Sequence, residues 1–318
     1  MNSWKLSAGT ACLLGKKSGR SDAPPSTAYI MLGERCRNNC SFCAQARQSK
    51  AAGHLLSRVT WPEVEAAEAA TAVQQAYAAG RLRRACFQVV NEVNGRTATL
   101  AALQELAGDG MPICVSGIMQ NVAEAEELLA AGAERICIAL DAATPEVYLS
   151  AKGGEWQEKW MLLTACAARF PGRITTHLIV GLGESEEDIV KVLGDCSALG
   201  ITVGLFAFTP VRGTVWSNRL PPELGQYRRC QIAHRLLALG ESVGMIKCRA
   251  GRIVEVELTE EELRQRLYDG VAFQTSGCPD CNRPFYNERP GGVMYNYPRP
   301  LTELEISNAI KESGISGR

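Results

Sequence analysis

Short runs of β-branched, aromatic and other apolar residues alternate along the chain with longer stretches rich in Ala, Leu and Glu. The short runs have the length of buried strands, and the longer stretches have the spacing of helices. About eight strand–helix units without a linker favour an α/β fold, a complete or nearly complete (β/α) barrel of the TIM type. Strands are expected at residues 28–32, 85–90, 112–115, 135–140, 175–180 and 203–208, with weaker ones near 244–247 and 271–274.

Polar residues mark the starts of several helices. Thr60, Thr144 and Ser185 each precede a proline or acidic residues, as residues at the start of a helix commonly do. Further helices are expected at 100–106, 122–131, 222–239 and 260–268.

The order of the elements divides the chain into three parts. Residues 1–27 form an N-terminal extension, 28–276 the barrel, and 277–318 a cysteine-containing loop and a helix. Residues just after the strands of a barrel converge on one face, which carries the active site. We expect both extensions to lie over this top face.

The composition excludes some classes of function. Among 318 residues, 34 are Lys or Arg and 34 are Asp or Glu, so nothing indicates nucleic-acid binding. No apolar run is long enough to cross a membrane, and the first residues make a poor secretory signal, so we expect a cytoplasmic protein. Thirteen cysteines in such a protein favour metal binding or catalysis over disulfides.

Three of these cysteines lie within eight residues directly after the first strand, as Cys36-Arg-Asn-Asn-Cys40-Ser-Phe-Cys43. Their thiolates can hold three irons of a [4Fe–4S] cluster and leave the fourth iron open for chemistry. A zinc knuckle completed from elsewhere, or plainly buried cysteines, are the alternatives.

This segment resembles the signature of the radical S-adenosylmethionine (SAM) superfamily, C-x3-C-x2-C, and Phe42 stands in its aromatic position. The resemblance implies that SAM binds the open iron. It also implies that an electron from the cluster cleaves SAM to a 5′-deoxyadenosyl radical, which removes hydrogen from an unactivated carbon. The electron donor would be a ferredoxin or a flavodoxin.

The same resemblance suggests further SAM-binding residues at strand ends. Glu92 matches the acid of a methionine-binding segment, and Asp141 matches a ribose-binding acid, although it could simply cap the turn before Thr144. In the segment from His177 to Glu184, Ile179 would pack on the adenine and Glu184 would brace the turn. No catalytic residue is assigned beyond the clusters.

A second pair of cysteines, Cys278 and Cys281, follows the last expected strand. On a barrel this pair is expected on the active face, where it could hold a second [4Fe–4S] cluster with Cys12 as the preferred third ligand. Cys248 and Ser276 are alternatives. The remaining six cysteines are by default small buried residues. Three of them, Cys86, Cys114 and Cys137, lie on expected strands. They resemble the arrangement in biotin synthases, where strand cysteines and an arginine hold a [2Fe–2S] cluster inside the barrel.

The whole chain is similar to biotin synthases, and its tail CPDCNRPFYNERPGG is most similar to subunits of the two-part lipoyl synthases. That resemblance implies sulfur insertion into an octanoyl chain on a lipoyl-carrier protein, together with a second radical SAM subunit. The alternative is conversion of dethiobiotin to biotin. The tail also contains several arginines and tyrosines: Arg283, Tyr286, Arg289, Tyr295 and Arg299. They could form a rim that binds an acidic carrier protein, or they could simply belong to a solvated loop.

Overall fold

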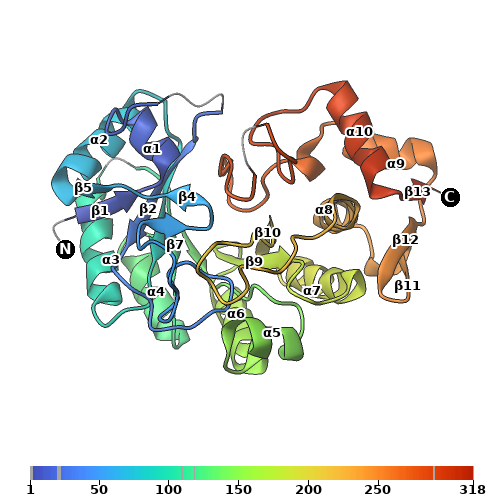
Figure 1. Ribbon diagram of the computed structural model, residues 1–318, viewed down its shortest axis with the longest axis horizontal. Coiled ribbons are helices and arrows are strands. Elements are labelled where there is room, and N and C mark those ends of the chain that lie inside the picture. Colours follow the sequence, from blue (N-terminus) through green and yellow to red (C-terminus); the bar gives the residue numbers. More distant parts are fainter. Residues whose placement is uncertain (1–2, 20–22, 109, 118, 289–290, 318) are drawn as a thin grey trace.

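The computed structural model describes residues 3–19, 23–108, 110–117, 119–288 and 291–317 (Figure 1). Its main sheet has eight strands in the order β10-β9-β8-β7-β6-β2-β1-β5 within this described part. Six neighbouring strands are parallel and form the wall of a (β/α) barrel: β2 (Thr27–Leu32), β6 (Arg84–Val89), β7 (Ile113–Ser116), β8 (Arg135–Cys137), β9 (Ile174–Val180) and β10 (Thr202–Ala207).

Helices connect these strands and bury their apolar faces against the sheet in one large hydrophobic core. Thr144 caps α5 and Ser185 caps α7 with a capping box, as the sequence predicts. The helices are α1 (Ala8–Leu13), α2 (Ala66–Ala78), α3 (Gly95–Glu105), α4 (Val122–Ala130), α5 (Pro145–Lys152), α6 (Trp156–Arg169), α7 (Glu186–Ala198), α8 (Leu224–Ala238), α9 (Glu260–Leu267) and α10 (Glu303–Ser313). None of the helices in the described ranges is long and apolar enough to cross a membrane.

The barrel type is confirmed, but the two weaker strands are not part of its wall. One is β11 (Ile246–Arg249), which forms a hairpin with β12 (Arg252–Val256) in a separate sheet with β13 (Ser316–Gly317). Ala250 and Gly251 join the hairpin with positive φ angles, the turn geometry that brings two strands directly together. The other is a short 3-10 helix, η2 (Val271–Phe273).

The start predicted at Thr60 is wrong. This residue lies in β4 (Val59–Thr60), which pairs with β3 (Leu55–Leu56), and β5 (Glu63–Glu65) follows it. Helix α2 begins at Ala66, where the Glu65 carboxylate accepts hydrogen bonds from the amides of Ala67 and Glu68. The side chain of Glu65, rather than that of Thr60, therefore caps the start of α2.

The N-terminal extension does not lie over the top face, whereas the C-terminal one reaches it at Tyr286 and Asn287, which line a cavity beside Cys43. The N-terminal segment adds β1 (Ser3–Leu6) to the sheet, antiparallel to β2 and β5. In the C-terminal segment, the Asp280 carbonyl accepts a hydrogen bond from Thr27, the first residue of β2, at 3.2 Å. The second cysteine pair thus enters the barrel near the N-terminal ends of its strands, the end opposite to the expected one.

Candidate active site

The three-cysteine loop lies at the C-terminal end of β2. Cys36, Cys40 and Cys43 line one cavity of about 180 Å³ there, and none of them is in a disulfide. Burial raises the pKa of Cys40 to about 11 and that of Cys43 to about 12. Metal binding offsets the cost of ionising these buried thiols, because the metal coordinates the deprotonated thiolate.

The donor set of this cavity fits an iron–sulfur cluster. No three His, Cys, Asp or Glu side chains of the described residues are placed to hold a single metal ion. The three thiolates of a cluster each bind a different iron, so they converge on a shared space rather than on one point. Cys36, Cys40 and Cys43 meet this requirement because all three face the same cavity.

Phe42 and Asp141 also line this cavity. The Phe42 ring packs against Trp216, with 6.5 Å between the ring centroids. Asp141 has a φ of +67° and forms an ion pair with Lys152 at 2.7 Å (Oδ2 to Nζ). Sequence reasoning missed Lys152, which also lines this three-cysteine cavity, called the cluster cavity below.

Glu92 lies apart from the cysteines. Its carboxylate accepts a hydrogen bond from the Glu34 amide at 2.9 Å, and it lines a different cavity of about 270 Å³ between the sheet and α3. Its neighbour Asn91 lines both that cavity and the cluster cavity, and it donates to the Asn38 side chain at 2.9 Å. Asn91 is therefore better placed than Glu92 to contact a ligand in that cavity.

Ile179 lines a second cavity of about 160 Å³, which shares Phe42, Cys43 and Asp141 with the first; we call it the substrate cavity. Glu184 is buried, and its carboxylate oxygens have no hydrogen-bond partner with good geometry among the described residues. Burial raises the pKa of Glu184 to about 7. Its surroundings suit a structural group more than an ionised ligand.

A third cavity of about 40 Å³ lies inside the barrel and shares Gln88, His177, Phe206 and Tyr286 with the substrate cavity. We call it the cysteine chamber, because five cysteines line it. Three come from neighbouring strands, where register places Cys86 beside Cys114, and two come from the tail. Its cysteines are Cys86, Cys114, Cys137, Cys278 and Cys281.

The sulfur atoms of the chamber contact one another and polar neighbours. The Cys278 and Cys114 Sγ atoms are 3.6 Å apart, and the Cys281 Sγ is 3.4 Å from the Tyr29 hydroxyl. Cys137 Sγ lies 3.3 Å from His177 Nε2. Burial lowers the pKa of His177 to about 4, so this imidazole is neutral at pH 7.

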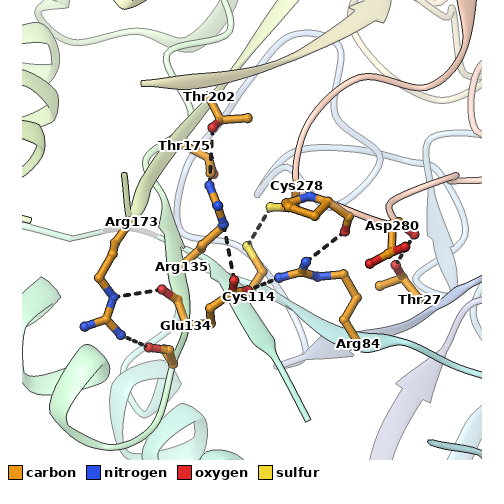
Figure 2. A network of polar contacts seen from close by, with 12 residues as sticks. Thr27, Arg84, Cys114, Glu134, Arg135, Arg173, Thr175, Thr202, Cys278 and Asp280 are labelled. Carbon is orange, nitrogen blue, oxygen red and sulfur yellow. Dashed lines mark hydrogen bonds and ion pairs between the residues drawn. The ribbon is translucent and has the colours of Figure 1, made fainter. Parts of the chain in front are cut away.

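Arginines surround Cys278 (Figure 2). Arg84 donates to the Pro279 carbonyl at 2.8 Å, and Arg135 donates to the Thr202 hydroxyl at 3.3 Å. The contact with the Cys114 thiol lowers the pKa of Cys278, and Arg84, Arg135 and Arg283 lower it further. Cys278 is thus a thiolate more readily than an ordinary cysteine.

The structure does not bring Cys12, Cys248 or Ser276 to the chamber. In the described structure, Cys12 lies in α1 with its Sγ 3.9 Å from the Ser18 carbonyl, and Cys248 lies in the hairpin strand β11. Ser276 Oγ accepts a hydrogen bond from the Leu205 amide at the edge of β10. Cys86, Cys114 and Cys137 all line the chamber, so their side chains point into the barrel, a direction that short apolar runs leave open.

The expected rim of arginines and tyrosines does not form. Tyr286 and Tyr295 are buried, and the Arg283 guanidinium lies 3.8 Å from the Phe206 ring centroid inside the chamber. Arg299 pairs with Glu305. Arg289 lies outside the described residues.

Comparisons with known proteins agree with this architecture. The family model described as the radical SAM superfamily matches residues 30–196, more than half of the chain. No match was found among curated protein sequences.

Among solved structures, the FeFe-hydrogenase maturase HydG from Carboxydothermus hydrogenoformans is similar, with a TM-score of 0.55 and 17% identity over 91% of this chain and 66% of that chain. Methylornithine synthase (PylB) is similar with a TM-score of 0.50 and 16% identity, over 92% and 82% of the two chains. A second HydG structure has a TM-score of 0.56 and 10% identity, and the match covers 76% of this chain.

This chain thus spans less than two thirds of the length of the two HydG chains, 66% and 54%. At these identities the likeness concerns the fold. The family match begins within β2, includes Cys36, Cys40 and Cys43, and continues through the barrel into α7. The chain therefore belongs to the radical SAM superfamily.

Proposed function

We propose that this protein inserts sulfur into unactivated C–H bonds of a protein-bound octanoyl chain. The observation that carries the proposal is the cysteine chamber, which adjoins the substrate cavity and is lined by none of the cysteines of the three-cysteine loop. When bound, the first cluster with SAM would supply the radical that removes hydrogen, and a second cluster in the chamber would supply sulfur. A second radical SAM subunit would take part in completing the lipoyl group.

The chain's own residues divide this work. Cys36, Cys40 and Cys43 would hold the first cluster, and the Asp141–Lys152 pair borders the space left for SAM. The walls of the substrate cavity exclude water from the reacting carbon, because they include the apolar side chains of Phe42, Leu56, Ile179, Phe206 and Phe208.

The chamber offers more thiols than a cluster requires. Cys278 and Cys281 come from the tail, and Cys114 lies in contact with Cys278. We therefore propose these three cysteines as the ligands of the second cluster, with Cys114 in the place expected for Cys12. The 3.6 Å contact is a thiol–thiol hydrogen bond, and binding a cluster requires the two side chains to rotate apart. Arg84 and Arg135 would balance the charge of the bound thiolates.

Biotin synthase activity is the second candidate. The inward direction of Cys86, Cys114 and Cys137, with Arg283 beside them, favours it. An unbranched octanoyl chain suits the apolar walls of the substrate cavity better than a polar ureido ring, which needs hydrogen-bond partners.

Counting clusters tests the chamber. After anaerobic reconstitution we expect about eight iron atoms per chain in the wild type and about four in Cys278→Ala/Cys281→Ala or in Cys114→Ala. Cys12→Ala and Cys166→Ala/Cys196→Ala are the controls, since Cys166 and Cys196 are buried in the main core. Retention of all iron in the tail variant would contradict the proposed ligand set.

Product analysis tests the substrate. Reconstituted protein is incubated with SAM, a reductant and either an octanoylated carrier peptide or dethiobiotin, and the products are measured by mass spectrometry. A sulfur-containing octanoyl peptide supports the proposal, and biotin alone supports the second candidate. Formation of 5′-deoxyadenosine with neither product would show radical chemistry on a different substrate.

A further inference from the structure

Two cysteines of the cysteine chamber are not used by the proposed ligand set. Cys86 and Cys137 line the chamber beside Cys114, Cys278 and Cys281, the proposed ligands of the second cluster. Neither Cys86 nor Cys137 is in a disulfide, so both remain thiols when that cluster is bound. We call these two side chains the spare thiols.

A thiol beside a radical site is a hazard, because an S–H bond is weaker than the C–H bonds of an alkyl chain. When a 5′-deoxyadenosyl radical meets a thiol, a hydrogen atom moves from sulfur to carbon. The S–H bond breaks and a C–H bond forms, which leaves 5′-deoxyadenosine and a thiyl radical. SAM is then consumed without product, so a site that keeps thiols near its substrate needs a means of excluding this side reaction.

Each spare thiol contacts a polar side chain that also borders the substrate cavity. The Gln88 side-chain amide donates to the Cys86 Sγ at 3.0 Å, and the His177 Nε2 lies 3.3 Å from the Cys137 Sγ. Gln88 and His177 line both the chamber and the substrate cavity, whereas these two cysteines line the chamber and not the substrate cavity. Gln88 lines the cluster cavity as well, so its side chain lies where the three cavities meet.

The strands place Gln88 and His177 in a layer above the spare thiols. Cys86 and Gln88 are alternate residues of β6, so their side chains face the same side, and Gln88 is nearer the C-terminal end of the strand. Cys137 pairs with Thr175 of β9, and His177 comes two residues later, toward the same end of the barrel. The three-cysteine loop lies at that end, so a radical formed beside it reaches this layer before the sulfur atoms.

We propose that Gln88 and His177 form a partition that keeps the spare thiols from quenching the 5′-deoxyadenosyl radical. Both are positioning residues, because each fills the space between one thiol and the substrate cavity and holds the sulfur atom in place. The His177 ring is itself fixed by the Phe206 ring, at 4.9 Å between the centroids. The proposal rests on the radical chemistry of the family and on the ligand set above, not on the octanoyl substrate.

Deuterium tests the partition, because thiol hydrogens exchange with solvent and alkyl hydrogens do not. Reconstituted protein is incubated in deuterated water with SAM and titanium(III) citrate, a reductant without a thiol, and no substrate is added. In Gln88→Ala we expect the deuterated fraction of 5′-deoxyadenosine, read by mass spectrometry, to rise about threefold or more above that of the wild type. In Gln88→Ala/Cys86→Ser it should return to the wild-type value, because the O–H bond of serine is too strong to donate its hydrogen atom.

The second half of the partition gives an independent pair of variants, which keeps the test decisive if one variant does not fold. His177→Ala should raise the deuterated fraction, and His177→Ala/Cys137→Ser should restore it. The matched control is Asn287→Ala, which also removes a polar side chain of the substrate cavity at a position that does not line the chamber. It should leave the deuterated fraction at the wild-type value.

Thiol alkylation tests the same partition without either cluster. In cluster-free protein we expect iodoacetamide to modify Cys86 about threefold or more faster in Gln88→Ala than in the wild type, with Cys12 of α1 as the internal reference. Peptide mass spectrometry reads the rate at each cysteine. An unchanged rate at Cys86 would overturn its shielding by Gln88.

Three outcomes of the deuterium experiment would overturn the proposal. The first is a wild-type deuterated fraction in both Gln88→Ala and His177→Ala. The second is a rise that persists after the paired cysteine is replaced, and the third is an equal rise in Asn287→Ala. The experiments need no octanoyl substrate, so this proposal and the proposed function can fail separately.

Discussion

Asp141 and Lys152 form a buried ion pair whose loss should affect both stability and the site. Lys152 ends α5, and its ammonium also donates to the Ala139 carbonyl at 2.6 Å. Burial lowers the pKa of Lys152, but the Asp141 carboxylate outweighs this effect, and the pKa lies above its ordinary value. The pair therefore remains ionised, and each charge needs the other.

We expect Lys152→Met to lower the free energy of unfolding by about 3 kcal/mol, because it leaves the Asp141 carboxylate buried without its cation. Urea denaturation of the cluster-free protein measures this change. In Asp141→Asn/Lys152→Met no charge is left unpaired, so most of the loss should be recovered. A double variant as unstable as the single one would show that the pair has no such role.

Sequence reasoning at the level of single residues succeeded where the chemistry is local. Cys36, Cys40 and Cys43 occupy one short loop, so their spacing alone indicates that they act together. The chamber joins residues about 160 positions apart, Cys114 and Cys278, and no local pattern reports such a contact. The position after a strand was also misleading for Cys278, because the strand expected before it is absent from the barrel wall.

The junction of the cluster loop (residues 33–50) with the β10 loop (residues 208–220) depends on Gly213, whose carbonyl accepts from the Lys50 amide. Its φ is +92°, and a Cβ at this position would lie 2.5 Å from the Ala51 nitrogen. Any side chain here must push the two loops apart, since the atoms it meets are backbone. Because Phe42 packs on Trp216 of the β10 loop, this displacement would also reach the three-cysteine cavity.

We therefore expect Gly213→Ala to lower the free energy of unfolding by about 2–3 kcal/mol and to weaken SAM binding. Gly172→Ala is the control: its φ is +72°, but a Cβ there meets no atom within 4 Å. It should cost only about 1 kcal/mol and leave SAM binding unchanged. Denaturation curves and equilibrium dialysis with SAM measure the two effects; equal losses in both variants would contradict the close contact.

Whole elements were predictable where their pattern is long, as for α8, or where their caps are plain, as for α5 and α7. Of the last two expected strands, the first forms as β11 but outside the barrel wall, and the second is a 3-10 helix, because a short apolar run buries equally well in a barrel strand, a hairpin or a 3-10 helix. The choice between a seventh barrel strand and a hairpin is made by the turn at Ala250 and Gly251 and by the tertiary packing of β12 against α7.

Across the whole molecule, Arg228 joins the C-terminal tail to the barrel. This residue of α8 is almost fully buried, and its guanidinium donates to the carbonyls of Met294 and Tyr295 and to the Glu312 carboxylate. In Figure 1 the tail passes between the barrel and the end of the molecule that carries α9 and α10. The placement of Cys278 and Cys281 thus depends on contacts far from the chamber.

We expect Arg228→Met to speed amide hydrogen exchange in residues 291–313 by at least tenfold while β6 and β7 keep their protection, because it leaves buried carbonyls without donors. The control is Arg266→Met, which removes a more exposed ion pair with Glu241. Hydrogen exchange read by mass spectrometry resolves the two regions. Uniformly faster exchange over the barrel would show that Arg228 stabilises the whole fold rather than the tail.

The edge of the barrel wall at β10 has a consequence for solubility. An open strand edge offers its amides and carbonyls to any other chain, and proteins with such edges tend to aggregate. Here the Ser276 side chain accepts from the Leu205 amide, and the Asn287 side chain accepts from the Ala207 amide and donates to its carbonyl. Side chains of the tail thus bind the backbone groups of Leu205 and Ala207 without forming a strand. A strand of a second molecule therefore cannot pair continuously with this edge.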